Sequence, residues 1–264
     1  MADLIVERRG GILLLTINRE HVRNAIDAAT AAAIDKALTE GDADPAVGAF
    51  VLTGIGSRAF CSGMDIKEAA RIGAGHGLIP GRGFAGITQG RRNKPLIAAV
   101  NGIAVAGGLE IALACDLIFA ADHAQFGLSE IKRGLFAFAG GIQRLAQQVP
   151  RATAMAIILT GEAVSAQRLH QLGVITEVVP AADLLARSLE VTAGILTYSG
   201  EAIRNAKQLF EMAVDAPLDQ SLRFGNAFGQ ATLNSAVSRE GVKAYAEHRP
   251  ADLGGKDDSG KTQP

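Results

Sequence analysis

Four short apolar runs recur along the chain and limit its possible folds more than any other feature. They cover residues 49–53, 96–100, 116–121 and 174–179, and the first two are bounded by glycine or proline. Runs of this length suit strands that are buried on both faces of a sheet covered by helices. Helical patterns alternate with them, for example over residues 28–40, where Asp27 is the predicted N-cap. The sequence therefore predicts an α/β fold.

The two ends of the chain differ from this central pattern. Residues 4–8 and 12–17 have the composition of strands joined by a turn at Arg9-Gly10-Gly11. From about residue 181 the pattern is helical, with expected helices at 182–197, 200–214, 217–233 and 238–248. We expect a core over 1–180 that carries the site, a helical region over 181–250, and a disordered tail over 251–264. The tail is predicted because no large apolar residue follows Leu253.

The composition excludes several classes of protein. The chain has 264 residues, 48% of them hydrophobic, and a net charge of −1, so it can bury a large core. Nucleic-acid-binding domains are normally markedly basic, and this balance argues against such a partner. No stretch approaches the roughly 20 apolar residues of a membrane span, and no signal peptide is evident. Cys61 and Cys115 lie in apolar sequence without metal-ligating neighbours, which predicts free thiols, no metal site and a cytoplasmic location.

Glu110 is the only charged residue between Asn101 and Asp116. An isolated carboxylate in such an apolar run is costly to bury unless something pairs with it or uses it. Gly107 and Gly108 precede it, and glycines at the start of a helix leave N–H groups free to bind an anion, as in an oxyanion hole. The alternative is that the glycines ease helix packing while Glu110 interacts favourably with the helix dipole.

Glu130 stands in a turn-like segment twenty residues after Glu110. Two carboxylates from separate loops can form an acid and base pair, although an isolated glutamate more often faces solvent. Nucleophilic and metal-dependent hydrolysis are disfavoured, because the chain contains neither Gly-x-Ser-x-Gly nor His-Glu-x-x-His.

The sequence from Gly54 to Ala59 matches the letters of a dinucleotide-binding fingerprint, but no Asp or Glu occurs between Ala69 and Leu109 to bind a ribose. A nicotinamide or flavin cofactor is therefore not expected. Basic residues are concentrated locally instead, which favours a small polyanionic ligand such as a nucleotide-like cofactor, the alternative being solvated basic loops. They are Arg8, Arg9, Arg19, Arg23, Arg71, Arg82, Arg91, Arg92 and Lys94.

Taken in order, four motifs resemble the enoyl-CoA hydratase/isomerase (crotonase) family across nearly the whole chain. They are NREHVRNA at 18–25, AFCSGMDIKE at 59–68, AVNG at 99–102 with AGGLE at 106–110, and AQFGLSE at 124–130 followed by GGIQRL at 140–145. The resemblance implies a crotonase-like (ClpP/crotonase) spiral of ββα units with C-terminal helices that assemble a homotrimer or a dimer of trimers.

The resemblance also implies an activity. The N–H groups of Met64 and Gly107 would form the oxyanion hole, and Glu110 and Glu130 would be the two catalytic glutamates. Because both glutamates are retained, it favours addition of water to a trans-2-enoyl-CoA over double-bond isomerisation or a hydratase-lyase reaction. A non-catalytic acyl-CoA-binding protein is a further alternative. The acyl-CoA is the substrate, and no metal or redox cofactor is implied.

Further positions follow from the same resemblance. The coenzyme A contacts would fall on Val22, Arg23, Ala25, Ser62, Asp65, Ile66, Lys67 and Gly108. Two departures from the family pattern concern substrate choice: Ser129 replaces a common proline, and Phe136 and Phe138 replace small residues and proline in the loop at the expected acyl pocket. A phenylalanine ring in the acyl tunnel would limit chain length, the alternative being that both rings pack against neighbouring helices. His248 replaces a lysine that often contacts coenzyme A, which implies weaker electrostatic binding of the adenine end.

Overall fold

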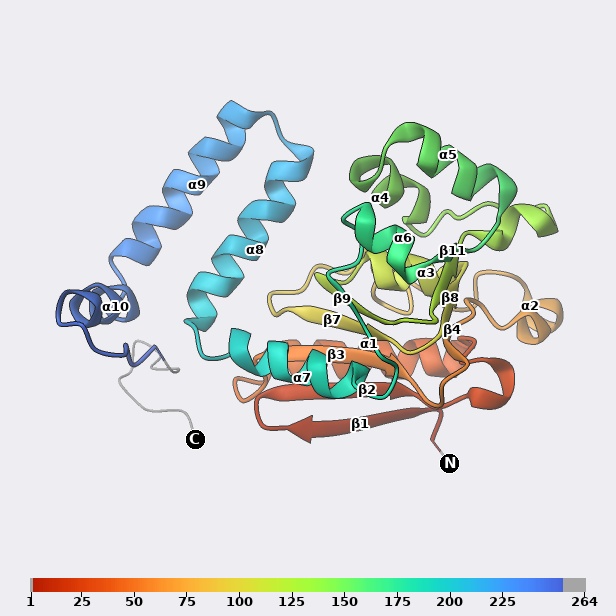
Figure 1. Cartoon of the computed structure of the whole chain (residues 1–264), viewed down its shortest axis with the longest axis horizontal. Coiled ribbons are helices and arrows are strands. Elements are labelled where there is room, and N and C mark those ends of the chain that lie inside the picture. The colour runs from red at the N-terminus through yellow and green to blue at the C-terminus, as the bar shows by residue number, and fades with distance from the viewer. Residues whose placement is uncertain (1, 254–264) are drawn as a thin grey trace.

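The computed structural model describes residues 2–253 and contains two main sheets (Figure 1). In the larger sheet, only the first pair of strands is antiparallel, and the remaining neighbours are parallel. Its strands, in spatial order, are β1 (Leu4–Arg9), β2 (Ile12–Ile17), β3 (Ala49–Gly54), β7 (Leu96–Val100), β9 (Leu117–Ala121) and β12 (Glu177–Val179). The predicted hairpin is present, and Gly10 provides its turn with a φ of 61°.

A smaller sheet lies against the first. Its strands, in spatial order, are β11 (Val164–Ser165), β10 (Gln125–Gly127), β8 (Ile103–Val105) and β4 (Ala59–Cys61). Strands β3, β7 and β9 of the large sheet each lead into one strand of the small sheet and then into a helix. These helices are α2 (Ile66–Ile72), α3 (Gly107–Leu113) and the 3₁₀ helix η2 (Ser129–Arg133). The three repeats lie side by side, as expected for a spiral of ββα units.

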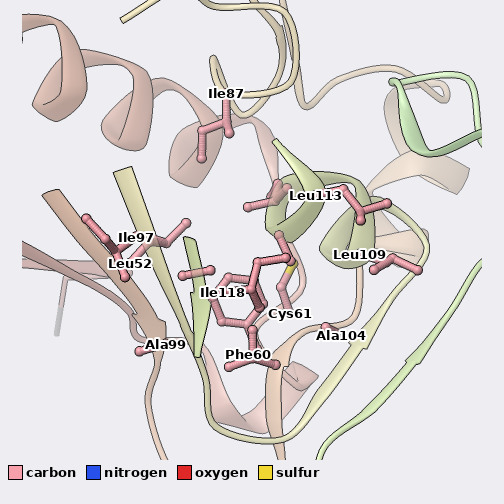
Figure 2. Close-up of a cluster of buried hydrophobic side chains, with 14 of the residues drawn as sticks. Leu52, Phe60, Cys61, Ile87, Ile97, Ala99, Ala104, Leu109, Leu113 and Ile118 are labelled. Atoms are coloured by element: carbon pink, nitrogen blue, oxygen red, sulfur yellow. The ribbon is translucent and has the colours of Figure 1, made fainter. Parts of the chain in front are cut away.

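The core fills the space between the two sheets. Figure 2 shows Leu52, Ile97 and Ile118 of the large sheet beside Phe60 and Cys61 of β4. Leu109 and Leu113 of α3 close the same cluster, and all seven side chains are buried. Helix α3 therefore begins at a fixed point above the core, which positions the Gly-Gly-Leu-Glu segment.

Helices cover the sheets and extend the chain. The N-terminal half has η1 (Glu20–Val22) and α1 (Ala28–Ala43), and a small hairpin of β5 (Leu78–Ile79) and β6 (Gly83–Phe84). After η2 come α4 (Gly141–Gln148), α5 (Arg151–Thr160) and α6 (Ala166–Gln171). The Asp27 side chain accepts a hydrogen bond from the N–H of Thr30 and caps α1 as predicted.

The C-terminal region contains α7 (Leu184–Ile195), α8 (Gly200–Asp215), α9 (Leu218–Leu233) and α10 (Ala236–Ala246). Helix α7 packs on β3, β7 and β9, whereas α8 and α9 pack on each other and stand beside the core (Figure 1). The four predicted helices are thus present, and α10 begins two residues earlier than expected because Ser235 caps it. The predicted disorder of 251–264 falls almost entirely outside the described residues. Within residues 2–253, no helix has the length and hydropathy of a membrane span.

Two features of the strands differ from the expectation. The run at 174–179 forms a strand only over β12, because the N–H groups of Val174 and Ile175 are turned toward the carbonyl of Leu169. The strands of the smaller sheet were not predicted, since two to three residues are too few to show an alternating pattern.

Candidate active site

All but one of the predicted site residues line a single cavity of about 410 Å³. Its wall includes Met64, Gly107, Glu110, Glu130, Val22, Arg23, Ala25, Ser62, Asp65, Ile66, Lys67, Phe136 and Phe138. These residues come from η1 and the loop after it, β4 to α2, the start of α3, and η2 with the segment that follows. The topology thus brings together motifs that lie more than a hundred residues apart in sequence.

Gly108 does not line this cavity. A Cβ atom built on Gly108 would collide with the carbonyl oxygen of Cys61, so this glycine allows α3 to pack closely against β4. Its placement supports a structural function in positioning α3. The substrate contact expected at Gly108 has no counterpart in the geometry.

Two backbone N–H groups face the cavity without a protein acceptor. The Ile26 N–H donates to the Gly63 carbonyl at 2.8 Å, and the Asp65 N–H donates to the Ile26 carbonyl at 2.9 Å. The N–H of Met64, which lies between Gly63 and Asp65 in the sequence, has no such bond among the described residues. Gly107 is the first residue of α3, where a helix has no internal acceptor for its N–H. Within residues 2–253, neither N–H donates to protein.

Gly63 holds these two donors close together. Its φ is 91°, and a Cβ atom there would lie 3.0 Å from the Gly107 nitrogen. A side chain at position 63 would therefore strain the backbone and cover one of the two donors. Two convergent N–H groups in a cavity form a potential oxyanion hole.

The Glu110 carboxyl is buried, with only 4% of the residue exposed. Its Oε1 accepts a hydrogen bond of 3.0 Å from the N–H of Gly141, at the start of α4. Burial raises the pKa of Glu110, while the Gly141 N–H and the positive charge of Arg144 act in the opposite direction. A Cβ on Gly141 would approach the Glu110 Cγ to 2.9 Å, so position 141 must remain a glycine for this contact.

The Glu130 carboxyl lies near Glu110 but has fewer partners. Its Oε2 is buried and has no hydrogen-bond partner among the described residues 2–253. Burial raises the pKa of Glu130 to about 7; the charge of Glu110 adds to the increase and Arg133 opposes it. A carboxyl group with such a pKa can either donate or accept a proton near neutrality.

The basic residues separate into structural and cavity-lining groups. Arg19 is buried and pairs with Asp27 at 2.8 Å and with Asp65 at 3.1 Å, which holds Asp65 in place in the cavity wall. Because Asp65 also caps α2, its carboxylate is already fully engaged. Of the basic residues noted in the sequence, only Arg23 lines the cavity, together with Lys67 of the second motif and Arg133 at the end of η2. Arg92, in contrast, donates to the carbonyls of Gly86 and Ile87.

Phe136 and Phe138 lie on the open side of the cavity. They are 62% and 53% exposed, and their rings meet edge to face with centroids 6.0 Å apart. The sequence did not single out Leu78 and Phe84, which reach the same cavity from the β5–β6 hairpin. His248 follows α10 and is not part of this cavity. Helix α10 and helix α2 lie on opposite sides of the molecule (Figure 1).

The segment that matched a dinucleotide fingerprint connects β3 to β4 and enters no helix. It therefore lacks the helix N-terminus on which a pyrophosphate would bind. Within the described residues, no cluster of three or more His, Cys, Asp or Glu side chains is arranged to hold a metal.

Comparisons with known proteins agree with this arrangement. Residues 7–256 match the family model described as enoyl-CoA hydratase/isomerase. A probable enoyl-CoA hydratase of Rhizobium meliloti (strain 1021) is 36% identical, over 95% of this chain and 97% of the relative. The 2,3-dehydroadipyl-CoA hydratase of Escherichia coli (strain K12) is 33% identical, over 97% and 100%. The crystal structure of enoyl-CoA hydratase EchA1 from Mycobacterium marinum superposes with a TM-score of 0.89 at 38% identity, covering 94% of this chain and 97% of that one.

Proposed function

The chain belongs to the enoyl-CoA hydratase/isomerase family and is an enoyl-CoA hydratase, a lyase, and we propose that Glu110 and Glu130 together hold and activate its water. The reaction adds water reversibly across the Cα=Cβ bond of a trans-2-enoyl-CoA and gives a 3-hydroxyacyl-CoA.

One observation carries this proposal: the buried Glu110 and the half-buried Glu130 share one cavity, and the buried Oε2 of Glu130 has no partner within residues 2–253. Leaving such an oxygen buried and unsatisfied is unfavourable by about 1–3 kcal/mol. A water molecule between Glu110 and Glu130 would satisfy the free Oε2 of Glu130. That water would also lie where the hydroxyl group of the product must form.

The thioester oxygen would bind to the N–H groups of Met64 and Gly107. Addition of water to the double bond places negative charge on this oxygen in an enolate-like transition state. Donors that are already oriented toward the charge stabilise it without reorganisation, and loss of one such donor typically costs about 2.7–4 kcal/mol. The free N–H groups beside Gly63 support this step.

The two glutamates would perform different proton transfers. Ionised Glu110 would accept a proton from the water, and the Gly141 N–H would hold its carboxylate in place. Protonated Glu130 would deliver a proton to Cα. The pKa of Glu130 near 7, raised mainly by burial, suits a group that donates in one direction and accepts in the other.

Arg23 and Lys67 would bind the coenzyme A moiety electrostatically at the mouth of the cavity, with backbone contacts from the remaining residues of the first two motifs. Phe136 and Phe138 would contact the far end of the acyl chain. Acid–base chemistry and N–H donors suffice for the reaction, so the proposal includes no metal or redox cofactor. The two free thiols support a location in the reducing cytoplasm.

We further propose a homotrimer or a dimer of trimers. Helix α8 has no buried residue in the single chain, and large apolar side chains along α8 to α10 are exposed. They include Phe210 at 72%, Leu218 at 74%, Leu222 at 60% and Tyr245 at 85% exposure. Apolar surface of this extent on a helical arm supports burial against other copies of the chain.

The activity is tested with purified protein and three measurements. Crotonyl-CoA should be hydrated rapidly, as followed by loss of the conjugated double bond, and a 3-enoyl-CoA should be converted far more slowly. Faster conversion of the 3-enoyl-CoA would instead identify an isomerase. Tight thioester binding without turnover of any enoyl-CoA in a chain-length panel would identify a binding protein.

A further inference from the structure

Arg133 is a cation of the cavity wall that the hydration mechanism does not use. It is the last residue of η2 and follows Glu130 by three positions. In a 3₁₀ helix, side chains at i and i+3 lie on the same side, and both residues line the cavity. Within residues 2–253, the Arg133 guanidinium has no ion pair and no hydrogen bond.

The neighbouring lysine shows how an ordinary cation of this segment behaves. Lys132 forms an ion pair of 2.7 Å with Glu162 and does not line the cavity. Arg19, which is buried outside the cavity lining, is likewise paired with Asp27 and Asp65. Arg133 is therefore an exposed cation of the cavity wall without a protein partner among residues 2–253, and this arrangement favours an anionic ligand.

The position of Arg133 indicates which part of a substrate it meets. A thioester oxygen on the Met64 and Gly107 N–H groups places Cα and Cβ between Glu110 and Glu130. An acyl chain that continued past Glu130 would run along η2, Leu135 and Phe136, which line the same cavity. A 3₁₀ helix rises about 2 Å per residue, so Arg133 lies roughly 6 Å along η2 from Glu130. That distance corresponds to a short acyl chain.

We propose that Arg133 binds the terminal carboxylate of a short dicarboxylic enoyl-CoA. The inference rests on the proposed hydratase function and names its substrate class. A guanidinium group binds a carboxylate with two parallel hydrogen bonds, which favours this anion at an unpaired arginine. Without Arg133, a third carboxylate would enter a cavity that already holds Glu110 and Glu130, and the like charges would repel it.

The test compares two six-carbon thioesters that differ only at the far end, trans-2-hexenoyl-CoA and trans-2-hexenedioyl-CoA. In the wild-type protein, kcat/KM should be higher for trans-2-hexenedioyl-CoA, which carries the terminal carboxylate, than for trans-2-hexenoyl-CoA. Arg133→Met should lower the ratio of dicarboxylic to monocarboxylic kcat/KM at least about tenfold, since hydrogen bonds to charged groups contribute that much. Arg133→Lys should restore part of it. Lys132→Met is the matched control and should leave the ratio unchanged.

Two results would overturn the proposal. One is a wild-type ratio of kcat/KM that does not favour the dicarboxylic thioester, or a ratio that is the same in Arg133→Met as in the wild type. The other is an equal loss for both thioesters, which would place Arg133 at a phosphate of coenzyme A or in the support of Glu130. Calorimetric binding of hexanoyl-CoA and adipyl-CoA provides the same comparison without turnover. If neither enoyl-CoA is hydrated, the hydratase function fails, while the binding ratio still decides the function of Arg133.

Discussion

At the scale of single residues, the carboxyl group of Glu130 shows how the site departs from what is best for folding. It is half-buried close to Glu110, and its buried Oε2 has no partner in the part of the chain that the structure describes. A surface glutamate would avoid both penalties. The arrangement is expected where a group must change its protonation state during a reaction.

The first prediction concerns stability. The folded-state pKa of Glu130, raised to about 7 mainly by burial, exceeds the usual value near 4.3. Between these values the folded protein binds more protons than the unfolded chain, so the contribution of Glu130 to stability falls as pH rises and stays reduced above pH 7. Glutamine resembles the protonated form. The free energy of unfolding of Glu130→Gln minus that of the wild type should therefore increase by about 1–2 kcal/mol from pH 5 to pH 8, after allowance for solvent screening.

Denaturant unfolding at both pH values, at fixed protein concentration, measures this difference. A constant gap between the two proteins would mean that Glu130 is ionised normally in the folded state.

The second prediction concerns the rate. Hydration requires protonated Glu130, whose pKa burial raises to about 7, so kcat/KM for hydration should fall as pH increases through that value. Dehydration of the 3-hydroxyacyl-CoA requires the ionised form and should lose activity below the same pH. Steady-state rates in both directions between pH 5 and 9 test the assignment. If kcat/KM for hydration instead increases through pH 7, Glu130 would be the base and Glu110 the acid.

At the scale of secondary-structure elements, glycines decide how closely the segments of the site approach one another. Gly63 follows β4, Gly107 begins α3 and Gly141 begins α4. Each lies where a side chain would meet another part of the site: the Gly107 nitrogen, the Phe84 ring and the Glu110 side chain, respectively. The chemistry therefore depends on close backbone approach as much as on the glutamates.

The third prediction separates backbone strain from this approach. Gly63→Ala places a methyl group 3.0 Å from the Gly107 nitrogen and should lower kcat for crotonyl-CoA at least tenfold. Gly73→Ala is the matched control, because Gly73 has a similar φ of 99° with no atom within 4 Å of its Cβ position. It should lower Tm by a similar amount while kcat remains close to that of wild type. Equal losses of kcat in both variants would show that strain alone explains the effect.

The sequence predicted the elements unevenly, and the reason is physical. Long buried strands such as β3 and β7 are continuous apolar runs, so composition reveals them. Strands β4, β8 and β10 have three residues each and acquire their identity from neighbours in the small sheet. Glu110 was identifiable because its charge is isolated in an apolar run. The unpaired state of Arg133 depends on where Glu162 lies, and only the folded chain shows that.

At the scale of the whole molecule, the site and the C-terminal arm occupy different parts of the chain. The middle of α8 is connected to the core by an ion pair between Lys207 and Asp116 and a hydrogen bond of 2.7 Å from Gln208 to Asn93. Beyond these contacts, α8 and α9 pack mainly on each other. The exposed apolar residues of this arm are where assembly should occur.

The fourth prediction tests that assembly. Wild-type protein should have the mass of three or six chains by light scattering at micromolar concentration. A charged residue in place of Phe210 or Leu222, as in Phe210→Glu, should shift the mass toward one chain, because a buried unpaired charge disfavours the interface. Arg223→Ala, which changes an exposed polar residue next to Leu222 on α9, should leave the mass unchanged. A monomeric wild-type protein would contradict the proposed trimer.

The central claim is that Glu110 and Glu130 act as a pair on one water molecule. It is tested most directly by the hydration of crotonyl-CoA in Glu110→Gln and Glu130→Gln, with thioester affinity measured in parallel. Each variant should lose at least about a hundredfold in kcat while binding the thioester nearly as wild type does, since general acid–base steps contribute roughly 10²–10⁴. A kcat close to that of wild type in either variant would contradict the account.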